Sequence, residues 1–99
     1  MDVRHGTEIA FRLGPGMHAE ARVWAERLAQ SAEGALRHVL FLNEEGEYGC
    51  LAEWDSADDA RDYGDRAEVR AALDELTARV GKAPRVRVYA MEEQELGRP

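Results

Sequence analysis

Histidine, cysteine and aromatic side chains are the residues of this 99-residue chain that could take part in chemistry, and they are few. The three histidines, His5, His18 and His38, fall on an N-terminal tail, an expected helix and an expected strand. No two of them have the spacing of a metal-binding pair. The glycine turn at residues 14–16 has proline at its centre, so it lacks the N–H donor that a phosphate-cradling loop needs. We therefore expect no metal site, no bound cofactor and no nucleophile–base–acid set.

His38 and Cys50 could each act singly. An imidazole exchanges protons near neutral pH, so His38 could serve as a base. Its strand alternates so that it faces the same side as Leu36 and Leu40, where a hydrogen-bonded core histidine is the more common role. Cys50 also falls in an expected strand, where a small buried hydrophobe is more common than a reactive thiol. Both interpretations of each residue stay open.

Charge and hydropathy restrict the partners of the chain. The formal net charge is −7, with 13 Lys and Arg against 20 Asp and Glu, which is the opposite of what a phosphate backbone attracts. No apolar run approaches the roughly 20 residues of a membrane span, and the first six residues contain no hydrophobic signal region. A single cysteine cannot form a disulfide within one chain. We expect a cytoplasmic protein that binds neither nucleic acid nor membrane.

Hydrophobic periodicity predicts the elements that would position these side chains. Alternation of Ile9, Phe11 and Leu13 indicates a strand, and apolar residues at helical spacing indicate helices. Ser56 and Asp65 are expected to cap the two pieces of the second helical region, whereas glycines stop the helices. The expected strands are residues 7–13, 36–43, 47–54 and 85–91, with helices at 17–32 and, interrupted at 63–65, at 55–80.

The order of these elements is strand, helix, strand, strand, helix, strand. Right-handed crossovers then give an α+β, ferredoxin-like βαββαβ fold, in which a four-stranded antiparallel sheet carries both helices on one face. We expect one domain over residues 1–99, with a core of about 7–91 and a loose tail at 92–99.

The sheet face without helices mixes charged and apolar side chains. Glu8, Arg87 and Met91 are expected there, together with either Phe41 or its neighbours, because both sides of the second strand are apolar. A second copy packed sheet to sheet would cover such a surface, so we predict a homodimer. A monomer with snorkelling arginines is the alternative.

The whole pattern resembles the antibiotic biosynthesis monooxygenase-like (ABM) domains, which form dimeric α+β barrels. The resemblance runs from about Thr7 to Met91 and is most distinct in Trp54-Asp55-Ser56, followed by Ala60 and Tyr63. It implies a ligand cavity between the sheet and the helices of each subunit. The family that the chain resembles includes cofactor-free monooxygenases of quinol- or anthrone-like aromatics, haem-degrading enzymes and proteins without known activity.

The resemblance can be tested residue by residue for haem degradation. Tyr63 occupies the place of an aromatic residue nine positions after the strand-end tryptophan, but Leu73 stands where the haem-ligating histidine would be. Leucine cannot ligate iron, so haem degradation is not expected.

Cofactor-free oxygenation needs only an aromatic pocket, a base and a group that holds an anion. Trp54, Tyr63, Tyr48 and Trp24 could line such a pocket, and His38 could take the proton. Arg37 or Arg87 would hold the anion. Each of these aromatic residues could instead be core packing. The alternatives are therefore a non-catalytic dimer that binds a small apolar molecule or supports a pathway, and a fold whose interior is filled.

Overall fold

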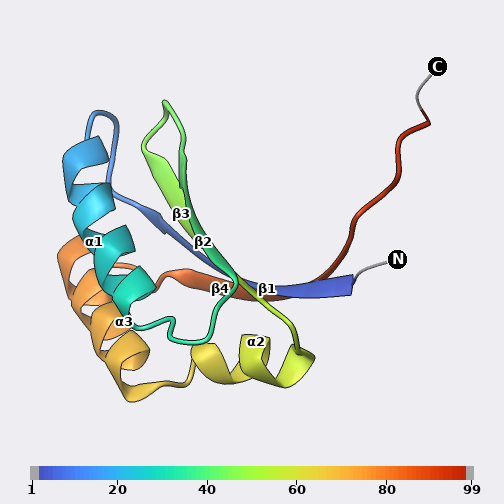
Figure 1. The fold of residues 1–99 in the computed structure, drawn as a ribbon. Helices are drawn as coiled ribbons and strands as arrows, with labels where there is room; N and C mark the ends of the chain where they lie inside the picture. Colours follow the sequence, from blue (N-terminus) through green and yellow to red (C-terminus); the bar gives the residue numbers. More distant parts are fainter. Residues whose placement is uncertain (1–2, 98–99) are drawn as a thin grey trace.

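The computed structural model describes residues 3–97, so the expected domain of residues 1–99 includes four terminal residues that lie outside it. Four strands and three helices follow one another in the predicted order (Figure 1). Their bounds are β1 Val3–Arg12, α1 His18–Gln30, β2 Arg37–Leu42, β3 Glu47–Trp54, α2 Ala57–Tyr63, α3 Ala67–Val80 and β4 Arg85–Glu92.

The strands form one antiparallel sheet in the order β2-β3-β1-β4. All three helices cover the same face of this sheet, and the residues after β4 run away from it (Figure 1). This is the ferredoxin-like α+β arrangement, so the predicted fold class is confirmed at the level of the single chain. The arrangement brings the ends of α1, β3 and α2, which are far apart in sequence, to one end of the layer between sheet and helices.

β1 begins at Val3, four residues before the expected Thr7. Gly6 and His5 break the apolar alternation, so periodicity gave no signal there. The extra residues are held by pairing with the end of β4, in the register Val3↔Glu92 and His5↔Ala90. His5 is therefore part of the sheet, and its placement on an N-terminal tail was wrong.

The expected caps agree with the structure at Ser56 and Gly81 but not at Gly34 or Asp65; α1 already ends at Gln30, with Ser31 as its C-cap. Ser56 Oγ accepts a hydrogen bond from Asp59 N at 3.1 Å, and Gly81 ends α3 with φ +83°. The expected cap at Asp65 is wrong. Asp65 N still donates to Asp62 O and Arg66 N to Tyr63 O, so the turn that ends α2 continues past Asp65. The N-cap of α3 is Arg66, whose side chain makes no capping bond.

The hydrophobic core fills the layer between the sheet and the helices. Cys50 is 1% exposed there, and burial raises the pKa of its thiol to about 12, so it is a buried hydrophobe rather than a nucleophile at neutral pH. The other large contributors are Ile9, Phe11, Leu28, Tyr48, Trp54, Tyr63, Val69, Leu73 and Leu76.

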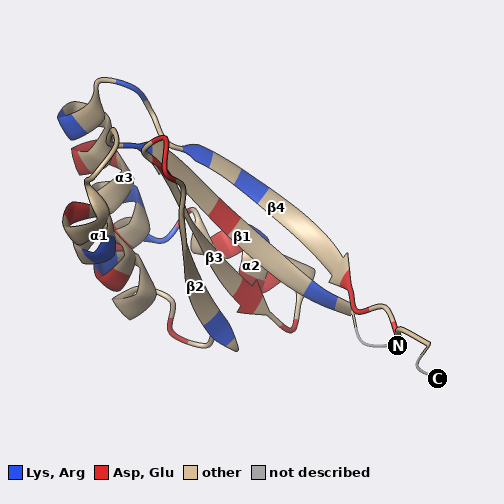
Figure 2. Ribbon diagram, turned by 90° about the horizontal axis from the view of Figure 1, so that it is seen from above, with Lys and Arg blue, Asp and Glu red and all other residues tan. Residues whose placement is uncertain are grey.

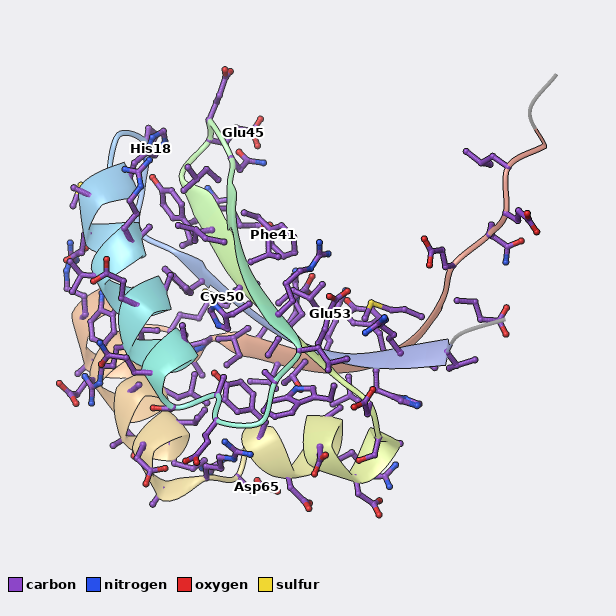
Figure 3. The ribbon with its side chains drawn as sticks, in the orientation of Figure 1. His18, Phe41, Glu45, Cys50, Glu53 and Asp65 are labelled. Atoms are coloured by element: carbon purple, nitrogen blue, oxygen red, sulfur yellow. The ribbon has the colours of Figure 1, made fainter. Side chains whose placement is uncertain are left out.

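Register settles which way the hairpin strands face. His38 pairs with Ala52 and Leu40 with Cys50, so these residues face the helices, and Val39 and Phe41 face the other way. Figure 3 shows Cys50 on the helix side, and Phe41 and Glu53 on the helix-free side. Basic and acidic residues are interspersed along the strands (Figure 2).

Candidate functional site

Trp54 and Tyr63 form one aromatic cluster beneath the end of α1. Trp54 is the last residue of β3 and Tyr63 the last residue of α2, so the fold brings the two chain segments together. Their ring centroids are 5.2 Å apart with an interplanar angle of 47°, and each residue is only 1% exposed. Such a tilted contact stabilises both rings beyond the area that they bury.

The hydroxyl of Tyr63 is hydrogen-bonded inside the protein. It donates a hydrogen bond of 2.6 Å to Leu28 O, near the end of α1. Burial, with a smaller contribution from Cys50, raises the pKa of Tyr63 well above its usual range. Tyr63 is therefore a neutral donor that ties α2 to α1, and it does not act as a base.

Two nitrogen atoms in this region are buried without a hydrogen-bond partner among residues 3–97, His38 Nε2 and Trp54 Nε1. Since His38 pairs with Ala52, it lies on the same sheet face as Trp54, at a diagonal position of about 7–8 Å between Cα atoms. Burial lowers the pKa of His38 from its ordinary value of 6.5, which keeps the imidazole neutral at neutral pH. A neutral imidazole can accept a proton, whereas an indole N–H can only donate a hydrogen bond.

A groove gives His38 access to the surface. It has a volume of about 260 Å³ and lies between α1 and the outer strand β2. Its lining comprises Arg22, Ala25, Glu26, Ala29, His38 and Leu40. Trp54 and Tyr63 do not line it, so the structure brings these two residues into contact and places His38 beside them, nearer to solvent.

His5 also lies close to Trp54, directly opposite it in the β1–β3 register. Trp54 therefore stands between a histidine on β1 and a histidine on β2, all on the face toward the helices. No periodic signal marked His5, because the extension of β1 depends on its pairing with β4.

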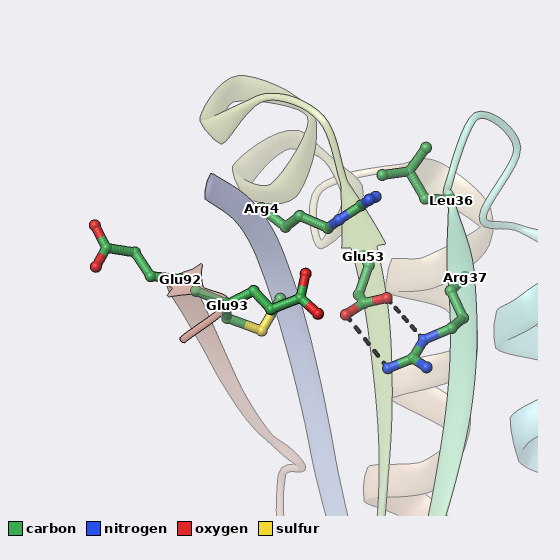
Figure 4. A pocket seen from close by; sticks show the side chains of 7 residues that line it. Arg4, Leu36, Arg37, Glu53, Glu92 and Glu93 are labelled. Atoms are coloured by element: carbon green, nitrogen blue, oxygen red, sulfur yellow. Dashed lines mark hydrogen bonds and ion pairs between the residues drawn. The ribbon is translucent and has the colours of Figure 1, made fainter. Parts of the chain in front are cut away.

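The two arginines expected to hold an anion lie on the wrong side of the sheet. Arg37 pairs with Glu53 at 2.7 Å on the helix-free face, and Arg87 pairs in register with Glu8 on that same face. The Arg37–Glu53 pair crosses a surface groove of about 460 Å³ (Figure 4). Neither arginine can therefore serve a cavity between sheet and helices.

Arg66 is the arginine that the sequence interpretation missed. Its guanidinium carbon lies 5.1 Å from the ring centroid of Trp54 and 5.6 Å from that of Tyr63. It follows Tyr63 by three residues, a spacing that puts two residues on one side of a turn, and this was the available signal.

Trp24 and Tyr48 have structural partners instead. Trp24 is half-buried on α1, with the guanidinium of Arg27 at 5.7 Å from its ring. The Tyr48 hydroxyl donates to Gly14 O at 3.1 Å and accepts from Met17 N at 3.0 Å, which fixes the β1–α1 turn. Neither residue lines the groove beside His38.

Two further features are absent from residues 3–97. No three His, Cys, Asp or Glu side chains are grouped to hold a metal ion. No helix there has the length and apolar character needed to cross a membrane. Leu73, at the position that a haem-ligating histidine would occupy, is buried in the core on α3.

Comparison with solved structures identifies the fold. A candidate antibiotic biosynthesis monooxygenase from Caulobacter crescentus CB15 is similar with a TM-score of 0.68 and 22% identity, over 93% of this chain and 92% of that one. Rv0793 from Mycobacterium tuberculosis is similar with a TM-score of 0.70 and 12% identity, over 92% and 97%. SnoaB from Streptomyces nogalater, described as a cofactor-independent oxygenase, is similar with a TM-score of 0.66 and 17% identity, over 97% of both chains.

No protein-family model and no curated protein matches the sequence. At identities this low, the structural similarity concerns the fold, and chemistry has to be argued from the site. The chain thus shares its ferredoxin-like α+β fold with candidate antibiotic biosynthesis monooxygenases and with the cofactor-independent oxygenase SnoaB.

Proposed function

We propose that this chain is a cofactor-independent monooxygenase of a quinol- or anthrone-like aromatic substrate, bound between the sheet and α1 beside His38 and Trp54. The observation that carries the proposal is the pair of buried, unpartnered nitrogens, His38 Nε2 and Trp54 Nε1, on one face of adjacent strands. An unpartnered buried polar group costs about 1–3 kcal/mol, so an oxygen-bearing ligand that pairs with both offsets that cost.

The chemistry assigned to these residues needs no cofactor. His38 Nε2 accepts the proton of a substrate hydroxyl, and the resulting aromatic anion supplies the electrons that reduce dioxygen. One oxygen atom enters the ring and the other leaves as water. Trp54 Nε1 donates a hydrogen bond to the substrate oxygen that carries the negative charge. Tyr63 holds the indole in place through the ring contact and the bond to Leu28 O.

The groove of about 260 Å³ between α1 and β2 is the proposed entrance. This volume lies just below the roughly 300–1,000 Å³ of typical small-molecule sites, which favours a compact aromatic substrate over a large one. Trp54 does not line this groove, so the proposal requires a side-chain movement that opens the groove toward the indole.

We also propose that the protein is a homodimer through the helix-free face. The apolar side chains of that face lie flat on glycines. A Cβ atom built on Gly49 would meet Phe41 Cδ2 at 2.8 Å, and one built on Gly6 would meet Leu51 Cδ1 at 2.8 Å and Met91 Cε at 2.9 Å. The result is a flat apolar surface of the kind that packs well against a second sheet.

Two carboxylates of that face, Glu53 and Glu8, already have partners within the chain. Arg37 binds Glu53, whose side chain is 15% exposed, and Glu8 Oε1 accepts a hydrogen bond of 3.2 Å from the Tyr89 hydroxyl. Because a paired charge is less costly to bury than a lone one, a second copy can cover this face without leaving an orphaned carboxylate. The alternative remains a monomer in which these side chains stay in water.

The other candidate function is a non-catalytic dimer that binds a small apolar molecule. What favours it is the complete packing of Trp54 and Tyr63, both 1% exposed, which leaves little room for chemistry beside them. In either case we propose a cytoplasmic location, which suits a chain whose single cysteine is buried and free.

Oxygen uptake by the pure, metal-free protein separates the candidates. We would incubate it with 1,8-dihydroxyanthrone and with naphthohydroquinone, and measure dioxygen consumption and probe binding together. The monooxygenase proposal predicts uptake above the buffer rate. Binding without uptake supports the non-catalytic candidate, and neither binding nor uptake over a broad set of aromatics counts against both.

A further inference from the structure

Arg66 occupies a position where stability alone would select another residue. It is the N-cap of α3, with φ −62° and ψ 141°, and its side chain makes no capping hydrogen bond. Ser, Thr, Asp and Asn are preferred at such positions because their oxygens accept from the first backbone N–H groups. A cation is also disfavoured at the positive end of a helix dipole.

The guanidinium of Arg66 instead spans the aromatic cluster. It lies over both the Trp54 and the Tyr63 ring, and its Nη1 donates a hydrogen bond of 2.9 Å to Ser31 O, just past α1. In the part of the chain that the structure describes, no ion pair is formed by Arg66. Its contacts therefore serve the cluster at the junction of α1, β3, α2 and α3.

This contact restricts the orientation of the Trp54 indole. The ring is fixed on one side by Tyr63, at 5.2 Å, and is covered by the planar cation of Arg66. An arginine stacks on aromatic faces more effectively than a lysine, because its guanidinium is planar and weakly hydrated. The direction of the unpartnered Nε1–H then depends on two stacking contacts rather than on a hydrogen bond of its own.

We propose that Arg66 is a positioning residue, which keeps the Trp54 indole in the orientation that presents its N–H to the substrate. The proposal rests on the proposed oxygenase function for its purpose, but its physical content, the holding of Trp54 by Arg66, can be measured without any substrate. A residue that breaks a local capping rule at the back of a candidate site is also where function is expected to override stability.

The test uses protein carrying Trp24→Phe, so that Trp54 is the single tryptophan. Arg66→Ser supplies a capping hydroxyl and removes the cation. Arg66→Lys keeps the positive charge but lacks the planar guanidinium. The control, Arg70→Ser, removes an exposed arginine from the same helix. Fluorescence emission, acrylamide quenching and Tm are measured for each, and kcat and KM are measured with 1,8-dihydroxyanthrone under oxygen.

We expect Arg66→Ser to change the Trp54 emission and increase its quenching by acrylamide, with kcat lower by about tenfold, the equivalent of one cation–π contact. Its Tm should stay close to that of the parent, because the new cap offsets the lost contacts. Arg66→Lys should fall between parent and Arg66→Ser in each readout, and Arg70→Ser should match the parent.

Unchanged Trp54 emission and quenching in Arg66→Ser would overturn the proposal. So would a changed emission with an unchanged kcat, since Arg66 would then be a structural contact only. If Arg66→Ser does not fold, Arg66→Lys carries the test by the same two criteria. If the parent protein itself consumes no oxygen, the proposed function fails. The fluorescence measurements then still decide whether Arg66 holds the Trp54 indole in place.

Discussion

His38 and Trp54 lie one diagonal step apart on the helix-facing side of β2 and β3, and each has a buried ring nitrogen without a hydrogen-bond partner within residues 3–97. One nitrogen belongs to a neutral imidazole that accepts a proton, and the other to an indole that only donates. This pairing of an acceptor and a donor across neighbouring strands is the basis of the following predictions.

Trp54→Phe should separate activity from stability. The change removes a buried donor that has no partner, and the relief of its desolvation cost offsets part of the lost volume. We expect the free energy of unfolding in urea to change by about 1–2 kcal/mol at most, while oxygen uptake falls by roughly 100-fold, as for loss of one donor to a developing anion. Trp24→Phe, on α1, is the matched control and should keep full uptake.

His38→Gln should remove a pH dependence of stability. Burial lowers the pKa of His38 below 6.5, so between the folded-state pKa and about 6.5 the unfolded chain binds more protons than the folded one. Its contribution to stability is therefore complete above pH 6.5 and is lost as the pH falls through the folded-state pKa. Urea titrations from neutral to acidic pH should show a shallower decline for His38→Gln than for the wild type.

The same substitution should affect the reaction. With His38 as the base, kcat/KM rises with pH up to the lowered pKa and is level at neutral pH. His38→Gln should reduce it by about 100-fold, the lower end of what a positioned base contributes. His18→Gln, at the start of α1, controls for loss of a histidine as such, and an equal loss of kcat/KM in both variants would count against the role of His38.

Tyr63→Phe should weaken the fold more than the reaction. The hydroxyl donates to Leu28 O inside the protein, and its removal leaves a buried carbonyl without that partner. We expect a loss of about 1–3 kcal/mol in the free energy of unfolding, with kcat reduced less than in Trp54→Phe. A fully stable variant with abolished activity would instead assign the hydroxyl a direct part in the chemistry.

Phe41→Asp should separate the proposed dimer. Phe41 is 42% exposed on the helix-free face and lies over Gly49, so a carboxylate there would be buried without a partner in the sheet-to-sheet contact. In sedimentation equilibrium we expect the wild type at twice the chain mass of 11.1 kDa and the variant at the chain mass. Val23→Asp, at a 64% exposed position on α1, should remain dimeric.

Much of the fold could be predicted from the sequence, because the strands and helices carry clear periods. The bounds of β3 at Glu47 and Trp54 agree with the expected strand, and Cys50 is buried as the more common role of such a residue suggests. Two features that the periodicity did not determine are set by partners distant in sequence. Pairing with β4 extends β1 to Val3, and only the register with β3 shows that Phe41 faces away from the helices.

The sequence suggested which residues to consider for a candidate site but not how they are arranged. The motif at the end of β3 pointed to Trp54 and Tyr63, and the structure places their rings in contact. The sequence could not show that the Tyr63 hydroxyl binds Leu28 O, nor that Arg37 lies on the opposite face, because both depend on how elements pack. Arg66 was missed because its position was interpreted as an ordinary helix start after Asp65.

The proposed hydrogen bonds between the oxygens of an aromatic ligand and the two nitrogens, Trp54 Nε1 and His38 Nε2, are tested most directly by nuclear magnetic resonance of ¹⁵N-labelled protein. Naphthohydroquinone would be added without oxygen while the indole N–H of Trp54 and the imidazole nitrogens of His38 are observed. We predict that the Trp54 N–H resonance moves downfield as it gains an acceptor, that the His38 nitrogens shift with it, and that Trp24 is unaffected. Binding of the probe with both signals unmoved, or movement of Trp24 alone, would contradict the account.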